Sequence, residues 1–194
     1  MKRPHGVVVA SKNDDKIAEI AAVLGALDPP IVIIGGHAWP DIEETQDTLA
    51  GNALLKARAV CEATGHAAVA DDTGLEVDAL GGDPGIHTAR YAGDDATYTD
   101  NVEKLLADLE GVTARTARFR TAIALVTPSS AEVIVEGVLE GVITTERRGS
   151  SGFGYDPVFE VPSDGRTLAE MESEEKNAMS HRAVALRLLA DHLG

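Results

Sequence analysis

The chain alternates between short apolar runs and longer segments in which apolar residues recur every three or four positions. Short runs at residues 7–10, 31–34 and 67–72, with another near 157–161, predict buried strands. Helical spacing predicts helices over residues 17–27, 48–64, 98–109 and 177–192. Residues 115–127 and 132–143 are rich in β-branched side chains and flank a Pro-Ser-Ser turn, which predicts two long antiparallel strands. This mixture predicts an α/β protein with a mixed sheet.

The run at residues 67–70 ends in two adjacent carboxylates, Asp71 and Asp72, followed by Thr73 and Gly74. The carboxyl ends of such strands face the ligand crevice in α/β proteins. Side chains alternate along a strand, so we expect Asp71 and Asp72 to point to opposite sides. One of them can then face a ligand or metal while the other anchors a turn. The same four residues are also typical of a turn with no further role, and this pattern alone leaves both interpretations open.

Composition restricts the class of protein. The chain has 194 residues, 44% hydrophobic and 25% charged, which is typical of one well-cored globular domain over residues 1–194. Its formal charge of −15 argues against a protein that coats nucleic acid or an anionic membrane. One cysteine, Cys61, excludes an intrachain disulfide and fits a reducing cytoplasm. We expect no signal peptide, because the apolar run after the basic start covers only residues 7–10, and no membrane span, because no apolar run is long enough.

Two segments carry candidate chemistry for phosphate groups. The first is residues 11–16, where the first strand leads into the first helix, and helix N-termini with a nearby lysine are natural phosphate sites. An ordinary N-cap explains these residues equally well. The second is the helix over residues 48–64, where Asn52 and Lys56 share a face and Glu43 and Glu44 precede it. Acidic residues before a helix and a surface lysine also fit this pattern.

Two later segments carry candidate chemistry for a base. Phe153 stands between Gly152 and Gly154, so its ring can stack on a nucleobase, although a core position is the simpler interpretation. Four side chains near the start of the predicted last helix can donate hydrogen bonds to phosphate or carbonyl oxygens: Lys176, Ser180, His181 and Arg182. The same four residues also fit a capping cluster on an exposed helix.

Four motifs in this order resemble the inosine triphosphate pyrophosphatase family, whose members are noncanonical purine nucleoside triphosphate pyrophosphatases. They are SxNxxK at residues 11–16, ADDTGLEVDALGGxPGIxTARYAG at 70–93, GFGYDPVF at 152–159 and EEKNAMSHR at 174–182. Each motif is weak alone, but four in order span nearly the whole chain. The resemblance implies an elongated mixed sheet flanked by helices, with two lobes and a central nucleotide cleft.

The resemblance also implies an activity. A purine triphosphate such as ITP, XTP or a deoxy form is hydrolysed to the monophosphate and pyrophosphate, with Mg²⁺ as the cofactor. It implies a homodimer that removes such nucleotides from the pool. The single cysteine and the negative charge predict a cytoplasmic protein that binds neither nucleic acid nor membrane. Two alternatives are a Maf-type pyrophosphatase acting on other modified nucleotides and a nucleotide-binding protein without catalysis.

Carried over motif by motif, the resemblance implies a role for each candidate residue. Asp72 is the catalytic residue that activates water, Glu44 and Asp72 hold the metal with support from Asp71, and Phe153 stacks on the purine. The remaining substrate-binding residues are Ser11, Lys12, Asn13, Asp14, Asp15, Lys16, Lys56, Thr73, Gly154, Tyr155, Asp156, Lys176, His181 and Arg182.

Two positions depart from the family pattern. Gly51 stands where a glutamate often precedes the helical asparagine, which leaves open whether Glu43 or Glu44 is the second metal ligand. His87 stands where the family commonly has tyrosine.

Overall fold

The computed structural model describes residues 2–194 and divides into two compact units. The first comprises residues up to Asp72 together with Thr121–Val138 and Ser180–Gly194, and the second comprises Thr73–Arg120 and Leu139–Met179. One eight-stranded sheet has the order β2-β1-β3-β5-β6-β7-β8, with β4 paired to β3. Parallel and antiparallel pairs both occur, so the predicted mixed α/β fold with flanking helices is confirmed.

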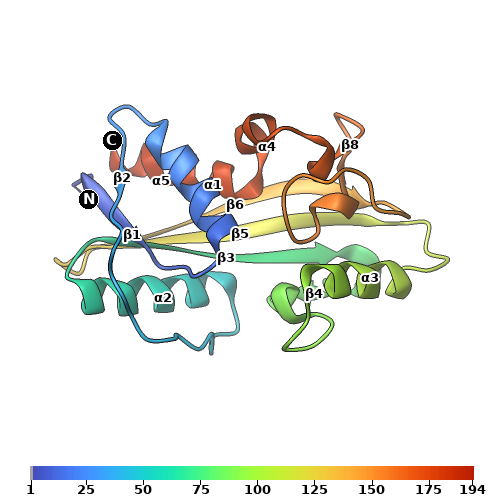
Figure 1. Ribbon diagram of the computed structural model, residues 1–194, viewed down its shortest axis with the longest axis horizontal. Helices are drawn as coiled ribbons and strands as arrows, with labels where there is room; N and C mark the ends of the chain where they lie inside the picture. The colour runs from blue at the N-terminus through green and yellow to red at the C-terminus, as the bar shows by residue number, and fades with distance from the viewer. Residues whose placement is uncertain (1) are drawn as a thin grey trace. The chain divides into compact units, whose positions relative to one another are not determined.

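The first unit has helices on both faces of its strands. β1 (Gly6–Val9) pairs in parallel with β2 (Val32–Ile33) and β3 (Ala68–Val77). Figure 1 shows α1 (Asp14–Gly25) and α5 (His181–Leu193) on one face and α2 (Leu49–Thr64) on the other. Val7, Val9 and Val69 join the core formed with α1 and α5. Burial on both faces explains why these strands read as continuous apolar runs.

The second helix begins within one residue of its predicted start, whereas the first begins at Asp14, three residues before the predicted residue 17. Asn13 caps α1 by accepting hydrogen bonds from the backbone N–H groups of Asp15 and Lys16. Thr48 caps α2 by accepting from the N–H of Gly51 at 3.0 Å, and Gly65 ends that helix in the left-handed conformation. These contacts satisfy backbone groups that have no partner within the helix.

The structure corrects the prediction that a strand ends at Asp71 and Asp72. β3 continues to Val77, and in the second unit Leu75 and Glu76 pair with Gly85 and Pro84 of β4 (Pro84–Gly85). Leu75 is fully buried. Pairing and burial therefore outweigh the turn tendency of the Asp-Asp-Thr-Gly sequence.

The second unit has its own core. Its helix α3 (Tyr98–Asp108) packs Val102 and Leu105 against a cluster that includes Phe119, Phe159 and Leu168. The strands of this core extend from β5 (Thr116–Val126) and β6 (Glu132–Ile143) to β7 (Phe159–Val161) and β8 (Arg166–Thr167). The predicted long strands are thus confirmed, whereas β8 has no counterpart in the sequence prediction.

The last predicted helix is two helices. α4 (Ser173–Met179) ends before Ser180, and α5 begins at His181. The Ser180 hydroxyl accepts a hydrogen bond from the N–H of Ala183 at 3.2 Å, so this residue is the N-cap of α5. A continuous helix from residue 177 is therefore wrong, because the serine side chain replaces the helical hydrogen bond at that point.

The glycine-rich stretch at residues 79–93 contains short ordered elements that sequence reasoning did not predict. These are η1 (Asp78–Leu80), β4 and η2 (Thr88–Arg90); two further short turns are η3 (Asp156–Val158) and η4 (Leu168–Glu170). Among residues 2–194, no helix is both long enough and apolar enough to cross a lipid bilayer.

Candidate active site

Asp71 lies at the centre of a buried ion cluster on the face of β3 covered by α1 and α5. Its Oδ2 atom accepts hydrogen bonds from Arg182 Nε at 3.1 Å and Nη2 at 3.0 Å, and Lys16 Nζ lies 3.1 Å away. Arg182 also pairs with Glu19 of α1. Burial raises the pKa of Asp71, but the charges of Lys16, Arg182 and Lys56 outweigh it and hold that pKa well below its usual range.

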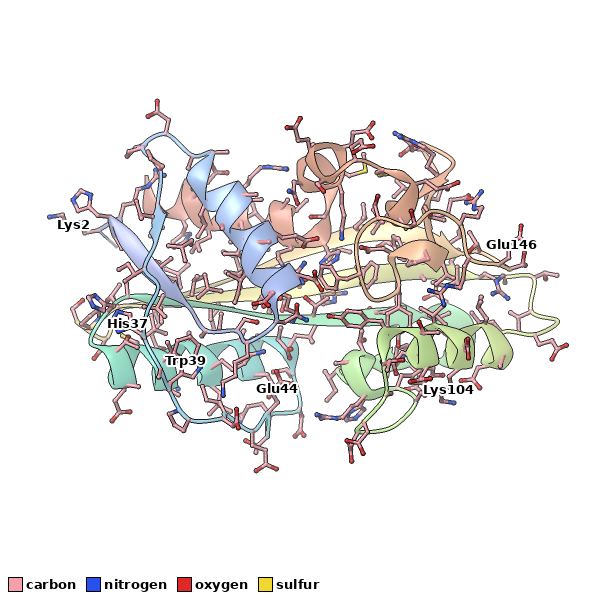
Figure 2. All side chains as sticks on the ribbon, in the orientation of Figure 1. Lys2, His37, Trp39, Glu44, Lys104 and Glu146 are labelled. Atoms are coloured by element: carbon pink, nitrogen blue, oxygen red, sulfur yellow. The ribbon has the colours of Figure 1, made fainter. Side chains whose placement is uncertain are left out.

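Asp72 points to the opposite face, toward α2. Its Oδ2 accepts from Asn52 Nδ2 at 3.1 Å, and its Oδ1 lies 3.4 Å from Lys56 Nζ. The same Lys56 nitrogen lies 2.6 Å from Glu44 Oε1, and Figure 2 labels Glu44 beside α2. The predicted opposite orientation of the two aspartates is therefore confirmed.

The two adjacent aspartates differ in electrostatics as well as in direction. Burial raises the pKa of Asp72, and the neighbouring charge of Glu44 raises it further, whereas Lys56 and Lys16 oppose the shift. Burial lowers the pKa of Lys56, but Asp72, Asp71 and Glu44 outweigh it, so the pKa of this ammonium is raised. Of the two carboxylates, Asp72 is thus the one whose ionised form is disfavoured by its surroundings.

The charges of this cluster do not cancel. Three cations, Lys16, Lys56 and Arg182, meet four carboxylates among the described residues: Glu19, Glu44, Asp71 and Asp72. Like charges near one another disfavour ionisation and attract cations. A polyanionic ligand therefore needs additional positive charge in order to bind beside Asp72.

The segment at residues 11–16 contributes one side chain to this cluster. Lys16 reaches Asp71, whereas Lys12 pairs with Asp41 at the surface. Ser11 accepts a hydrogen bond from the N–H of Asn13 at 3.1 Å, and Asn13 caps the helix. The N-cap interpretation therefore holds for this segment, and phosphate binding there stays a prediction for Ser11, Lys12, Asn13, Asp14, Asp15 and Lys16.

In the second unit, Asp156 joins the Phe153 loop to Lys176. Asp156 Oδ2 accepts from the N–H of Phe153 at 2.8 Å and from Lys176 Nζ at 2.5 Å. Lys176 Nζ also lies 4.7 Å from the centre of the Phe153 ring, a cation–π geometry. A Cβ atom on Gly152 would lie 2.1 Å from Asp156 Oδ2, so only glycine leaves room for this carboxylate.

The ring of Phe153 is half-buried rather than part of the core. It contacts the ring of Tyr98 at 5.8 Å between centres. Tyr155, predicted to shape the same pocket, is buried and donates its hydroxyl to the backbone oxygen of Thr88 at 3.0 Å. Gly154 has a φ of 61°, which only glycine adopts readily.

The remaining predicted residues lie in other positions. Thr73 follows Asp72 in β3 and is half-buried. His181 and Arg182 start α5 in the first unit, where both are buried at 4% and 2% exposure. Lys176 lies in α4, on a different helix from His181.

Sequence reasoning missed two residues that hold these groups in place. Glu19 pairs with Arg182, and its spacing of three residues from Lys16 on one helix was the available signal. Thr121 of β5 contacts the His181 ring, and nothing in the sequence singles it out.

The described residues include no group of three or more His, Cys, Asp and Glu side chains arranged to hold a metal ion. The pair formed by Glu44 and Asp72 is therefore the oxygen-ligand set to consider. Mg²⁺ is commonly bound through one or two carboxylates, with waters and substrate phosphates completing the shell. The donor chemistry of this pair fits such an ion.

Comparison with known proteins places the chain in a family. The model of the Ham1 family matches residues 7–192. A Geobacter sulfurreducens protein named dITP/XTP pyrophosphatase is 48% identical over 193 residues, covering 97% of this chain and 96% of its own. A Halalkalibacterium halodurans protein of the same name is 47% identical over 185 residues, covering 94% and 95%.

The fold agrees with this match. The solved structure of a HAM1 protein from Coxiella burnetii superimposes with a TM-score of 0.86 at 44% identity, covering 97% of this chain and 98% of its own. The chain belongs to the Ham1 family. The family indicated by the four sequence motifs is thereby confirmed.

Proposed function

We propose that this protein hydrolyses noncanonical purine nucleoside triphosphates, ITP, XTP and their deoxy forms, to the monophosphate and pyrophosphate. Membership of the Ham1 family supports this, as do relatives at 47–48% identity that are named dITP/XTP pyrophosphatases. The observation that carries the proposal is the arrangement at Asp72. A buried carboxylate lies between an amide donor, Asn52, and a cation, Lys56, that is shared with Glu44.

In this proposal Asp72 orients and deprotonates the attacking water. Asn52 Nδ2 holds one carboxylate oxygen of Asp72 at 3.1 Å, which fixes the direction of the other. Asp71 has the opposite role, because its ion pairs with Arg182 and Lys16 keep it ionised as a support.

The cations of the cluster hold phosphate charge. Lys16 and Lys56 lie beside the two aspartates, so each can exchange a carboxylate contact for a phosphate oxygen without leaving the site. Both ammonium groups would then stabilise the charge that develops on the leaving pyrophosphate. The residues of the segment at 11–16 and Thr73 complete the phosphate contacts in this proposal.

Mg²⁺ is the proposed cofactor, held by Glu44 and Asp72. When bound there, the ion supplies Lewis-acid chemistry that offsets phosphate charge and lowers the pKa of coordinated water. This assignment takes Glu44 rather than Glu43 as the second ligand, because Glu44 shares the Lys56 nitrogen with Asp72.

The base is assigned to Phe153 and the residues around it. Phe153 stacks on the purine, Asp156 fixes the backbone of its loop, and Gly154 and Tyr155 shape the pocket. On the family resemblance, Lys176 of the second unit, and His181 and Arg182 of the first, are each proposed to donate to the base edge or to phosphate oxygens. A donor aimed at O6 of hypoxanthine or xanthine meets an amino group in adenine, and a buried unpaired donor costs about 1–3 kcal/mol.

Product analysis tests the function. Purified protein is incubated with ITP, XTP, GTP and ATP, with Mg²⁺ or with EDTA, and pyrophosphate and orthophosphate are assayed separately. We expect Mg²⁺-dependent pyrophosphate release from ITP and XTP, with GTP and ATP nearly inert. Orthophosphate as the product contradicts the proposed reaction.

The same assay separates the alternatives. Turnover of pyrimidine or other modified triphosphates in place of ITP would indicate a Maf-type activity. ITP binding without turnover would indicate a nucleotide-binding protein that lacks catalysis.

We also propose a homodimer, on the family resemblance, and a cytoplasmic location, on the single cysteine. Light scattering on the eluted protein measures the mass, which should be twice the 20.3 kDa of one chain. A mass of one chain at assay concentration contradicts the dimer.

A further inference from the structure

The first turn of α5 is held tightly against neighbouring strands of the first unit. A Cβ atom on Gly137 of β6 would lie 2.1 Å from the backbone oxygen of His181 and 2.5 Å from the nitrogen of Ala185. Ser180 caps the same turn, and Arg182 pairs with Asp71 and Glu19. The backbone of His181 is therefore fixed from several sides, and what remains to be set is the rotation and protonation of its ring.

The side chain of Thr121 contacts the His181 ring and restricts its rotation. Its Oγ1 atom lies 2.6 Å from His181 Nδ1, and the two residues are 0% and 4% exposed. Buried hydrogen bonds of this length hold a ring firmly, since breaking one leaves polar atoms without water. A neutral imidazole has one donor and one acceptor nitrogen, so the bond made at Nδ1 decides what Nε2 offers.

We infer that Thr121 is a positioning residue for base recognition: its hydroxyl donates to His181 Nδ1 and so presents Nε2–H as a donor to the substrate. The inference rests on the proposed function, in which His181 contacts the nucleotide. A donor at Nε2 is complementary to the 6-oxo group of hypoxanthine and xanthine and not to the 6-amino group of adenine. Thr121 would thus act on substrate selection without touching the substrate.

Three substitutions separate positioning from simple packing. Thr121→Val keeps the shape and removes the hydroxyl, whereas Thr121→Ser keeps the hydroxyl. Thr167→Val is the matched control, because Thr167 is also fully buried and its hydroxyl donates to the backbone oxygen of Arg148 at 2.9 Å in the second unit. Thermal unfolding first establishes that each variant is folded.

Steady-state kinetics with ITP give the main result. We expect Thr121→Val to raise KM about tenfold with kcat changed less than about twofold, since a lost substrate-binding donor affects binding before chemistry. Thr121→Ser should restore KM to within about twofold of the unsubstituted protein, and Thr167→Val should leave KM unchanged. A Thr121→Val variant that is folded and has unchanged KM overturns the inference.

The tautomer is measured directly by ¹⁵N NMR of the histidine rings, with His181→Gln used to assign the signal. The inference requires an unprotonated Nδ1 and a protonated Nε2 in the unsubstituted protein, and a changed Nδ1 shift in Thr121→Val. A protonated Nδ1 overturns it, whether or not any variant folds poorly.

The two proposals fail in different ways. If the unsubstituted protein releases no pyrophosphate from ITP, the proposed function fails while the NMR result still decides the hydrogen bond. If the unsubstituted protein hydrolyses ITP, and Thr121→Val has the same KM and the same His181 tautomer, the proposed function stands and the proposed role of Thr121 is wrong.

Discussion

The two neighbouring aspartates, Asp71 and Asp72, show how the direction of a side chain determines its ion-pair partners and its pKa. Asp71 and Asp72 occupy successive positions of one strand, so they face different helices and acquire opposite pKa shifts. Asp71 is paired with Arg182 and Lys16, whereas Asp72 shares Lys56 with another carboxylate. The same substitution at the two positions should therefore have opposite consequences for stability and activity.

Asp72→Asn should lower the rate of hydrolysis by several orders of magnitude and leave folding intact. The raised pKa of Asp72 means that the folded state disfavours its charge, and a neutral amide removes that burden. Asn52 still has an acceptor at residue 72, and Lys56 keeps Glu44. We expect unchanged or higher stability in denaturant titrations. Turnover close to that of the unsubstituted protein would remove Asp72 from the catalytic role.

Asp71→Asn should destabilise the fold. The substitution replaces the charged partner of Arg182 Nε and Nη2 with a neutral amide, while Glu19 still pairs with this buried cation. Breaking one side of a buried pair typically costs about 3–5 kcal/mol. Urea unfolding monitored by far-UV circular dichroism measures this loss, with Asp72→Asn as the matched control. Equal stability of the two variants would contradict the assigned difference between them.

Some of these residues could be predicted from the sequence and others could not. A buried strand followed by Asp71 and Asp72 carries its own signal, because strand alternation fixes opposite directions. The direction does not reveal the partner: Arg182 lies 111 residues from Asp71 along the chain. Thr121 has no local signal, since a threonine in a strand is ordinary and only the packing of α5 makes its hydroxyl important.

At the scale of elements, the junction of β6 and α5 depends on one glycine. Gly137→Ala would place a Cβ atom 2.1 Å from a backbone oxygen, so the start of α5 must shift. We expect a loss of about 3 kcal/mol, the upper end for overpacking, and a raised KM for ITP because His181 moves. Gly25→Ala is the control, because no atom lies within 4 Å of a Cβ added there. A stability equal to that of the control would contradict the close packing.

The start of α3 should make stability depend on pH. Asp100 accepts from the side chain and backbone of Thr97, and these hydrogen bonds lower its pKa. A lowered pKa contributes stability above the usual aspartate value of about 3.9 and loses it as the pH falls through the folded-state value. Asp100→Asn should therefore be less stable than the unsubstituted protein at neutral pH, and the difference should shrink on acidification. Thermal unfolding of both proteins between acidic and neutral pH measures this difference in stability. A difference that does not change with pH would contradict the prediction.

Elements with long periodic patterns were predictable and short ones were not. α2, α3, β5 and β6 follow their sequence patterns closely, because burial of one face fixes the period. β4 and β8 have two residues each, too few for any period, and exist because neighbouring strands pair with them. The break at Ser180 was missed because apolar spacing continues across it while the backbone does not.

At the scale of the whole molecule, the net charge of the chain opposes the binding of its proposed ligand. The chain carries a formal charge of −15, yet its proposed ligand is a polyanion. Local cations such as Lys16 and Lys56 therefore have to overcome the overall field, and a divalent ion makes this easier. The Mg²⁺ dependence that we propose rests on this balance as well as on the family resemblance.

The two cores should unfold together. Each unit has a separate hydrophobic cluster, but β3, β5 and β6 each contribute residues to both units, so losing a strand in one removes its continuation from the other. The aromatic residues provide separate probes, because the single tryptophan, Trp39, lies in the first unit and all three tyrosines lie in the second. Figure 2 labels Trp39.

Urea unfolding is followed by Trp39 fluorescence in the unsubstituted protein and by tyrosine fluorescence in a Trp39→Phe variant. The two midpoints should coincide after correction for any effect of Trp39→Phe on stability. Leu186→Ala in the first core and Leu105→Ala in the second, both fully buried, should each lower both midpoints, by about 2–5 kcal/mol in stability. A Leu105→Ala variant that lowers the tyrosine transition and leaves the Trp39 transition unchanged would show that the units unfold independently.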